Sequence, residues 1–365
     1  MISAPALLRD ILRCPSVTPA DAGAQDVLIR TLEALGFKVT RLRFGEIENF
    51  FAEREGGGRH LCFAGHSDVV PPGEGWSYAP FAAEEQNGII YGRGAVDMKG
   101  GIAAFVAAAA RVPGHVSLLI TGDEEGEAVN GTVRVLEWMQ ANDKIPDFCI
   151  VGEPTCRARL GDAVKVGRRG SLNAVITVGG RQGHVAYPHL AENAVHKLIT
   201  FLSALTARPL DEGTPFFEPS SLQITSVDVG NEVSNIIPGE AVARLNIRFN
   251  DLHTGATLTA WLKSLLNQHA PGAELRVKVS GESFLTPQGS EVGALVTAIK
   301  YVTGHAPECN TGGGTSDARF ITHYCPVAEF GLVGATMHKI NEAVPVQELE
   351  QLVAIYETLI QDFCG

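Results

Sequence analysis

The sequence lacks the features that would direct it to a membrane or to an oxidising compartment. No apolar run is long enough to span a bilayer, and residues 1–19 contain no basic segment followed by an apolar core, so we expect neither a membrane helix nor a secretory signal. The seven cysteines are odd in number and include no C-x-x-C pair, which favours reduced thiols over a disulfide framework. These absences predict a protein of the bacterial cytoplasm.

The chain also contains fewer basic than acidic residues. The chain has 29 lysines and arginines against 41 aspartates and glutamates, which gives a net charge of −12. This acidity argues against nucleic acid or an anionic membrane as a partner, and it favours a small-molecule substrate. At 365 residues and 45% hydrophobic content, the chain exceeds the usual size of a single core, so we expect two domains.

The sequence does contain acidic and imidazole side chains that follow strand-like or glycine-rich stretches. Apolar runs at 61–64, 116–121, 148–151 and 327–332 each end in a polar loop. In open α/β sheets the ligand crevice lies beyond the carboxyl ends of the strands, so we expect these loops to converge there. The side chains concerned are His66, Asp97, Glu125, Glu153 and His338.

Taken one at a time, these side chains have ordinary interpretations. Asp97 follows a glycine-rich turn and precedes a helix, so it could be a helix N-cap. Glu124 and Glu125 could form a solvated acidic turn, and Glu153 and His338 could be ordinary loop residues. Their joint occurrence favours a metal centre, because two histidines and three carboxylates give each of two cations one histidine and one private carboxylate, with Asp97 shared.

Two neighbouring acids complete the predicted chemistry. Asp68 lies two residues after His66, where its carboxylate could accept the other ring N–H of His66 and fix the tautomer. When a histidine and an aspartate at this spacing occur without other ligand candidates, they more often form an ordinary loop contact. Glu124 points in a different direction from Glu125, so Glu125 can bind metal while Glu124 faces a water molecule as general base.

The middle of the chain alternates apolar and polar residues at strand spacing. The predicted order is strand, helix, strand, strand, helix, strand, which is the ferredoxin-like pattern. The segments are 171–178, 192–205, 221–229, 240–249, 256–268 and 273–279. We therefore expect an inserted domain at 171–282 and a discontinuous catalytic domain made of residues 1–170 and 283–365.

The motifs resemble those of one enzyme family over essentially the whole chain. G-H-S-D begins at Gly65, G-R-G-A-V-D-M-K-G at Gly92 and D-E-E-G at Asp123. They are similar to motifs of the zinc-dependent amidohydrolases, which include aminoacylases, acetylornithine deacetylase and desuccinylases. Segments typical of the branch that acts on N-succinyl-LL-2,6-diaminopimelate are 166–171, 182–188, 233–238, 312–320 and 337–342.

The resemblance implies two zinc ions per subunit, which cobalt or manganese could replace. His66 and Glu153 would hold one ion, and Glu125 and His338 would hold the other. Asp97 would bridge the two ions with one oxygen each.

It also implies the roles of the neighbouring residues and the fold. Glu124 would be the general acid and base, Asp68 would orient His66, and the peptide bond between Asp97 and Met98 would be cis. The fold would be α/β, with a mixed-sheet hydrolase domain for a dinuclear metal centre and an inserted ferredoxin-like α+β domain. That insert would act as a lid and as the dimerisation domain.

The resemblance further implies a homodimer in which the insert reaches the neighbouring subunit's active site. His184 and Tyr187 match the residues that do so, and His184 would donate a hydrogen bond to the developing oxyanion. The positions that match substrate-binding residues are Arg168, Tyr187, Asn235, Arg248, Gly314 and Thr315. The chain departs from the branch pattern at Gly334, where the branch has an asparagine.

The activity implied is hydrolysis of N-succinyl-LL-2,6-diaminopimelate to LL-2,6-diaminopimelate and succinate, in lysine biosynthesis. One alternative is the same chemistry on another N-acyl amino acid, such as acetylornithine. The other alternative is a metal-binding homologue without catalytic activity, against which the presence of Glu124 beside a full set of ligand residues argues.

Overall fold

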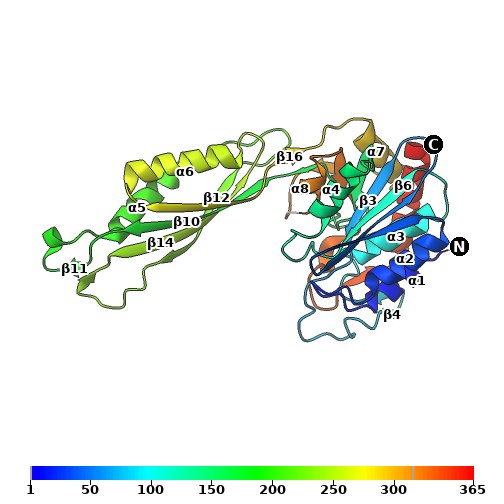
Figure 1. Cartoon of the computed structure of the whole chain (residues 1–365), viewed down its shortest axis with the longest axis horizontal. Helices are drawn as coiled ribbons and strands as arrows, with labels where there is room; N and C mark the ends of the chain where they lie inside the picture. The colour runs from blue at the N-terminus through cyan, green and yellow to red at the C-terminus, as the bar shows by residue number, and fades with distance from the viewer. Residues whose placement is uncertain (1, 315) are drawn as a thin grey trace. The chain divides into compact units, whose positions relative to one another are not determined.

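The computed structural model describes residues 2–314 and 316–365, and it contains two compact units (Figure 1). The first unit is built from residues 2–166, 286–310 and 316–365, and the second from residues 167–285 and 311–314. The second unit thus interrupts the first in the sequence. None of the helices in these described residues combines the length and apolar character needed to cross a membrane.

The first unit contains an eight-stranded mixed sheet with the strand order β1-β2-β6-β3-β7-β18-β8-β17. Its strands are β1 (Lys38–Phe44), β2 (Ile47–Arg54), β3 (Leu61–His66), β6 (Val116–Thr121), β7 (Phe148–Val151), β8 (Ala163–Lys165), β17 (Glu308–Asn310) and β18 (Val327–Glu329). The strands β6, β3, β7 and β18 pair in parallel, so their carboxyl ends lie at the same end of the sheet. Every residue of β3, β6 and β7 is buried, as expected for parallel strands covered on both faces.

Helices cover this sheet, and a small second sheet completes the unit. The helices are α1 (Ala4–Leu12), α2 (Ala24–Ala34), α3 (Lys99–Ala109), α4 (Thr132–Ala141), α7 (Ser290–Thr303), α8 (Ala318–Ile321) and α9 (Val346–Cys364), with the short 3-10 helix η2 (Gly334–Thr336). The second sheet has the order β19-β5-β4, formed by β19 (Ala343–Pro345), β5 (Ile89–Tyr91) and β4 (Glu84–Gln86).

Helix α3 is buried on every side and packs against α1 and α9. Its small residues allow this close packing. A Cβ atom on Gly101 would lie 2.7 Å from the carbonyl oxygen of Gly152, so only glycine lets the helix approach the loop that follows β7. The segment before α3 and the loop after β7 are thereby held together.

The second unit contains a four-stranded antiparallel sheet with the order β12-β14-β10-β15. Its main elements are β10 (Gly170–Gly179), α5 (Ala194–Leu205), β12 (Ser221–Asp228), β14 (Glu240–Phe249), α6 (Gly255–His269) and β15 (Glu274–Gly281). The shorter ones are β9 (Gly167–Arg168), β11 (Gly183–His184), η1 (Pro188–Leu190), β13 (Ile236–Ile237) and β16 (Phe284–Leu285). The strand and helix order predicted for the insert is confirmed.

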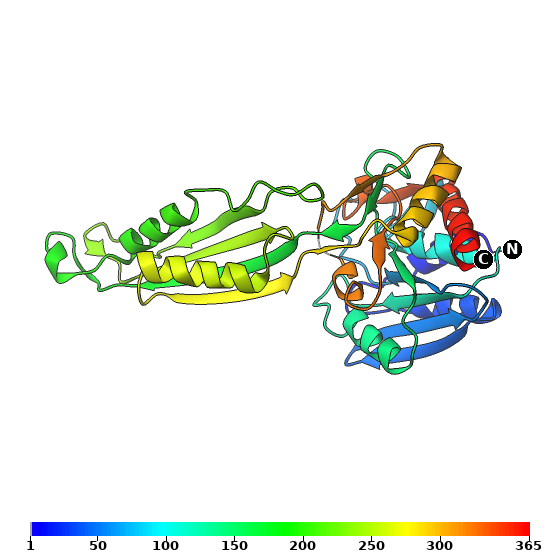
Figure 2. The same ribbon diagram turned by 90° about the horizontal axis from the view of Figure 1, so that it is seen from above.

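The core of the second unit follows directly from the spacing of its apolar residues. Every second residue of β10 from Leu172 to Val178 is buried, and α5 buries Ala194, Leu198, Phe201 and Leu205 at helical spacing. Both helices of this unit lie over the same face of its sheet (Figures 1 and 2). The unit therefore has its own two-layer hydrophobic core.

Candidate metal centre

The structure brings the five predicted ligand residues to the carboxyl ends of the parallel strands of the first unit. His66 ends β3, Glu125 follows β6 and Glu153 follows β7. Asp97 lies just before α3, and His338 lies just after η2, which follows β18 in the chain. The predicted strand topology indicated this convergence, and the loops meet there in the structure.

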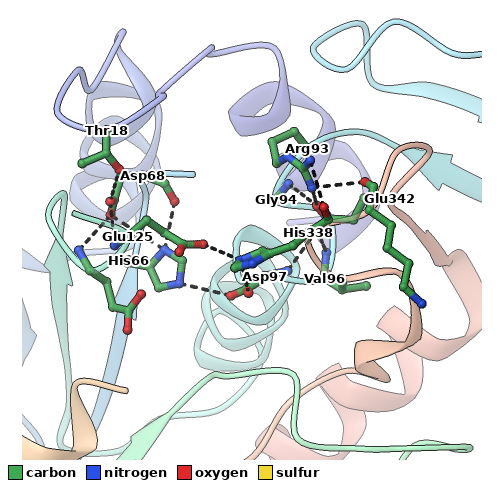
Figure 3. Close-up of polar contacts among 12 residues, drawn as sticks. Thr18, His66, Asp68, Arg93, Gly94, Val96, Asp97, Glu125, His338 and Glu342 are labelled. Carbon is green, nitrogen blue, oxygen red and sulfur yellow. Dashed lines mark hydrogen bonds and ion pairs between the residues drawn. The ribbon is translucent and has the colours of Figure 1, made fainter. Parts of the chain in front are cut away.

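Asp97 lies between the two histidines (Figure 3). Its Oδ1 atom is 3.2 Å from Nε2 of His66, and its Oδ2 atom is 3.1 Å from Nε2 of His338. Burial opposes ionisation of Asp97, but the hydrogen bonds from His338 and His66 lower the pKa of its carboxyl group below the ordinary value. Each oxygen of this carboxylate thus faces a different imidazole, which is the geometry of a bridging ligand. The peptide bond between Asp97 and Met98 is cis, as the resemblance implied.

The orientation of His66 differs in detail from the prediction. Its Nδ1 atom lies 2.9 Å from the backbone carbonyl oxygen of Asp68, whereas the nearest carboxylate oxygen of Asp68 lies 3.7 Å away. The backbone carbonyl therefore accepts the Nδ1–H hydrogen bond, so Nε2, which faces Asp97, is the ring nitrogen that could bind a metal ion in place of a proton. The residue spacing identified Asp68 correctly as the partner but not which of its oxygens accepts the bond.

The Asp68 carboxylate has a different task, which is to hold the turn after β6. It accepts hydrogen bonds from the backbone N–H groups of Glu125 at 3.1 Å and Glu124 at 3.4 Å, and from the hydroxyl of Thr18 at 2.5 Å. The sequence gives no signal for Thr18, which lies 50 residues from Asp68 and belongs to no motif. Asp68 thus positions both acidic residues of the D-E-E turn.

Buried acids outnumber nearby cations in this cluster. In the protein without cations, burial raises the pKa of Glu124 to about 8 and raises the pKa of Glu153 well above its usual value. Hydrogen bonds to Asp97 and Glu125 raise the pKa of His338 to about 10. Protons are therefore retained here to limit the burial of negative charge.

Divalent cations fit this donor set. His66, Asp97 and Glu125 place potential ligand atoms within 4.8 Å of one another, and so do His66, Glu124 and Glu153. Imidazole nitrogens and carboxylate oxygens are the donors that zinc takes at catalytic sites. Bound cations would replace the retained protons as the compensating positive charge.

A further group with similar residue types lies at the amino ends of the same parallel strands. Glu53, His60 and His115 also meet the distance condition for a metal site. Lys144 already lies 2.6 Å from Glu53, and His115 lies 3.1 Å from it. The rings of His60 and His115 stack with a centroid distance of 4.1 Å and an angle of 6°. Because the nitrogen lone pairs lie in these parallel ring planes, they do not converge on one ion.

The pKa values agree with this description of the amino-end group. Burial lowers the pKa of His60 to about 4, so its imidazole is neutral, and its Nε2 atom lies 2.7 Å from the hydroxyl of Ser117. Burial opposes ionisation of Glu53, yet hydrogen bonds from Lys144 and His115 lower its pKa. This group is therefore balanced by charges of the protein itself.

The predicted substrate-binding residues of the second unit fall at two opposite ends of its sheet. Arg168 lies in β9, directly before β10, and Arg248 pairs with Ser171 at the start of β10. His184 lies in β11, beyond the other end of β10. Asn235 is close to His184, because its carbonyl oxygen accepts a hydrogen bond from Val185 at 3.0 Å.

The other predicted substrate-binding positions are Tyr187, Gly314 and Thr315, and Gly334 is the departure from the branch pattern. Tyr187 is exposed, and its ring lies 5.7 Å from the ring of His184 between centroids. Gly314 is also exposed, and Thr315 lies outside the described residues. At Gly334, an added Cβ atom would lie 2.9 Å from the carbonyl oxygen of Pro154, so an asparagine at this position would need the neighbouring backbone to shift.

Comparisons with known proteins show the family of the chain. Residues 62–362 match the sequence model described as Peptidase family M20/M25/M40. The chain belongs to this family. It is 60% identical to the succinyl-diaminopimelate desuccinylase of Gluconacetobacter diazotrophicus, with 98% of this chain and 96% of the relative aligned. It is also 60% identical to the enzyme of the same name from Acidiphilium cryptum, with 97% and 96% aligned.

Solved structures of M20 proteins have the same fold. The M20 family metallo-carboxypeptidase Sso-CP2 from Sulfolobus solfataricus superimposes with a TM-score of 0.77 at 20% identity, covering 99% of both chains. The dinuclear metal-binding peptidase YXEP of Bacillus subtilis superimposes with a TM-score of 0.70 at 15% identity, covering 99% of this chain and 98% of the other. The family and the fold class predicted from the sequence are confirmed.

Proposed function

We propose that this chain hydrolyses the amide bond of N-succinyl-LL-2,6-diaminopimelate and releases LL-2,6-diaminopimelate and succinate, in lysine biosynthesis. The relatives named succinyl-diaminopimelate desuccinylase, at 60% identity over nearly the full length, support this substrate. The single observation that carries the chemistry is Asp97, whose two carboxylate oxygens face His66 and His338 separately. Such an arrangement suits two cations that share one carboxylate.

The proposed centre holds two divalent cations, with zinc as the first candidate and cobalt or manganese as substitutes. His66 and Glu153 would bind one cation, Glu125 and His338 the other, and Asp97 both. When bound, such cations polarise the amide carbonyl and make water more acidic. The hydrogen bond between Nδ1 of His66 and the Asp68 carbonyl keeps Nε2 directed toward Asp97 and the shared site.

Glu124 is the proposed general acid and base. In the cation-free protein burial raises the pKa of its carboxyl group, and cations bound beside it would favour the carboxylate, which is the form that accepts a proton. It would take a proton from the attacking water and pass it to the nitrogen of the leaving amine. The hydrogen bond from the Glu124 backbone to Asp68 fixes the position from which it acts.

The second unit supports a homodimer in which each copy completes the other's site. β10 has ten residues and is therefore about 30 Å long at the usual rise per residue. Arg168 and Arg248 lie at its start, whereas His184 and Asn235 lie beyond its end. An N-acyl amino acid is far shorter than this, so one substrate molecule cannot contact both groups within one copy.

We therefore assign Arg168 and Arg248 to the carboxylates of the substrate in their own subunit, where a guanidinium can bind bidentately. His184, with Tyr187 and Asn235 beside it, would serve the neighbouring subunit. The backbone N–H of Ala186 donates to Nδ1 of His184 at 3.0 Å, so the neutral ring carries its proton on Nε2. This exposed N–H can donate to the developing oxyanion of the substrate.

Subunit mixing tests this assignment. His184→Ala subunits and Glu124→Gln subunits should each be nearly inactive alone. If His184 acts across the interface, the mixed dimer contains one intact site, so mixing restores activity. Proven subunit exchange without recovery would place His184 in its own subunit's site or outside catalysis.

The substrate itself is tested by turnover with a panel of N-acyl amino acids. The purified protein should cleave N-succinyl-LL-2,6-diaminopimelate with a higher kcat/KM than N-acetylornithine, with metal content measured on the same sample. A preference for acetylornithine would keep the chemistry and change the substrate, and metal-loaded protein without turnover on any of them would reject the enzyme. The bacterial cytoplasm is the proposed site of action, in agreement with seven cysteines that form no disulfide.

A further inference from the structure

Arg93 and Glu342 form an ion pair inside the first unit, next to Asp97 and His338 (Figure 3). The Nη1 atom of Arg93 lies 2.7 Å from Oε2 of Glu342, and the two residues are 2% and 0% exposed. Burying two charges is unfavourable unless they are paired and hydrogen-bonded, so a fully buried pair requires an explanation in its other contacts.

Glu342 contacts the backbone of the loop that carries Asp97. Its carboxylate accepts hydrogen bonds from the N–H groups of Gly94 at 3.1 Å, Val96 at 3.0 Å and Asp97 at 3.2 Å. One side chain from the C-terminal part of the chain thus fixes three backbone groups next to the bridging carboxylate.

Arg93 contacts the loop that carries His338. Its guanidinium donates to the carbonyl oxygens of Lys339 at 3.2 Å and His338 at 3.4 Å, and to that of Pro72 at 3.2 Å. His338 has a positive φ of 59°, which is an uncommon conformation for a residue with a side chain and persists only where the surroundings hold it. The hydrogen bond to its carbonyl oxygen is one such restraint.

We propose that Arg93 and Glu342 are positioning residues, which fix the loop of Asp97 relative to the loop of His338 so that both ligands meet the same cation. This inference rests on the proposed function, because it assumes that Asp97 and His338 bind metal. Arg93 and Glu342 are not among the proposed metal ligands, and their hydrogen bonds go to each other and to backbone groups. They act on the ligand geometry through the backbone.

The net charge of the pair separates positioning from simple electrostatics. Loss of Glu342 alone removes a negative charge near the cations, and it leaves the charge of Arg93 buried without its partner. The double variant Arg93→Met with Glu342→Gln removes one charge of each sign, so the net charge stays as in the wild type. Any weaker binding of metal in the double variant then reports on geometry.

The experiment measures Zn²⁺ affinity of the full-length protein by competition with a chromophoric chelator, together with thermal unfolding, kcat and KM. Partners of metal ligands typically change metal affinity by about 10–100-fold when removed. We expect Glu342→Gln to weaken the binding of one of the two Zn²⁺ ions by this factor. The variant should also lower kcat more than it changes KM. We expect the double variant to unfold closer to the wild-type temperature than Glu342→Gln does, while its Zn²⁺ binding stays weak.

Glu53→Gln is the matched control. Glu53 is also a buried carboxylate in an ion pair, but it lies at the amino ends of the parallel strands. Its loss should lower the unfolding temperature and leave both Zn²⁺ affinities unchanged. An equal loss of Zn²⁺ affinity in Glu53→Gln would overturn the proposal, because general destabilisation would then explain the effect.

Wild-type Zn²⁺ affinity in the folded double variant would also overturn it. If neither that variant nor Glu342→Gln folds, Arg93→Lys decides, because it keeps the charge but a single ammonium cannot reach Glu342 and all three carbonyl oxygens. Unchanged Zn²⁺ affinity in Arg93→Lys rejects the proposal, and weaker affinity supports it. The Zn²⁺ measurement requires no substrate, so positioning can be supported even if N-succinyl-LL-2,6-diaminopimelate is not cleaved.

Discussion

The two ends of the parallel strands in the first unit carry the same residue types in opposite electrostatic states. At the carboxyl ends, His66 and His338 are surrounded by a larger number of acids, and burial raises the pKa of Glu124 and Glu153. At the amino ends, Glu53 has a lowered pKa because Lys144 and His115 donate to it. The carboxyl ends have an excess of acidic groups that a bound cation would balance. At the amino ends, Lys144 and His115 already balance Glu53.

This difference shows why residue type and distance alone do not define a metal site. Both groups have histidines and acids with ligand atoms within 4.8 Å of one another. In the amino-end group the two imidazoles stack, and Lys144 pairs with the carboxylate of Glu53. In the group at the carboxyl ends, here called the carboxyl-end group, His66 and His338 both face the carboxylate of Asp97. An excess of buried acid with converging nitrogen lone pairs is what favours a cation.

The largest change in activity is expected for Glu124→Gln, at the carboxyl ends of the strands. The variant should keep the metal content of the wild type, while kcat falls by about 10²–10⁴-fold, the usual contribution of general acid and base catalysis. Steady-state kinetics and metal analysis on the same sample check both parts. Loss of metal would instead make Glu124 a ligand.

Cations should stabilise the protein through the carboxyl-end group alone. At a free Zn²⁺ concentration of about 100 times the dissociation constant, binding to one site adds about 2.7 kcal/mol to the free energy of unfolding. Thermal unfolding with and without Zn²⁺ should show this gain in the wild type and in Glu53→Gln. If the gain disappeared in Glu53→Gln, the binding would lie at the amino ends, which would contradict the assignment of the metal site to the carboxyl ends.

In the cation-free protein, the stabilising contributions of Glu124 and Glu53 should change with pH in opposite directions. Glu124 has a folded pKa of about 8 and an ordinary value near 4.5, so between these values the folded state holds a proton that the unfolded state has lost. Stability from this group is present below pH 4.5 and is lost as the pH rises toward 8. Glu53 has a lowered pKa, so its contribution is present above pH 4.5 and is lost on acidification.

Unfolding temperatures measured across this range can separate the two groups. Glu124→Gln should flatten the decline on the alkaline side, and Glu53→Gln should reduce the loss on the acidic side. A Glu124→Gln profile that declines as steeply as the wild type would contradict the raised pKa.

The smallest effect is expected for Glu53→Gln under standard assay conditions. Loss of its hydrogen bonds with Lys144 and His115 should lower the free energy of unfolding by about 1 kcal/mol. Its kcat and KM should equal those of the wild type when measured in parallel. A change in kcat would show that the amino-end group influences the catalytic centre.

Much of the fold followed from local sequence patterns. The alternation within β10 and β14, and the helical spacing in α5, are complete within single segments, so the insert order could be predicted. The buried run of β3 and the polar residues after it likewise indicated where a site would form. The independence of the insert as a folding domain with bounds at 171 and 282 stays a prediction.

The parts of the site that depend on contacts between distant segments could not be predicted from the sequence. Asp68 was expected to face His66 with its carboxylate, but the i to i+2 spacing does not distinguish side-chain from backbone oxygens. Arg93 and Glu342 were visible only as members of motifs, since 249 residues separate them and their pairing depends on tertiary folding. Sequence spacing indicates candidate ligands, whereas the residues that hold ligand loops together appear only in three dimensions.

The most direct test is a titration of metal-free protein with Zn²⁺ while turnover of N-succinyl-LL-2,6-diaminopimelate is measured. Activity should rise with added Zn²⁺ and reach its plateau at two ions per chain in the wild type and in Glu53→Gln, whereas His66→Ala should bind fewer ions and remain inactive. Full activity before any metal is added, or the same titration curve in His66→Ala, would contradict a dinuclear centre at the carboxyl ends of the strands.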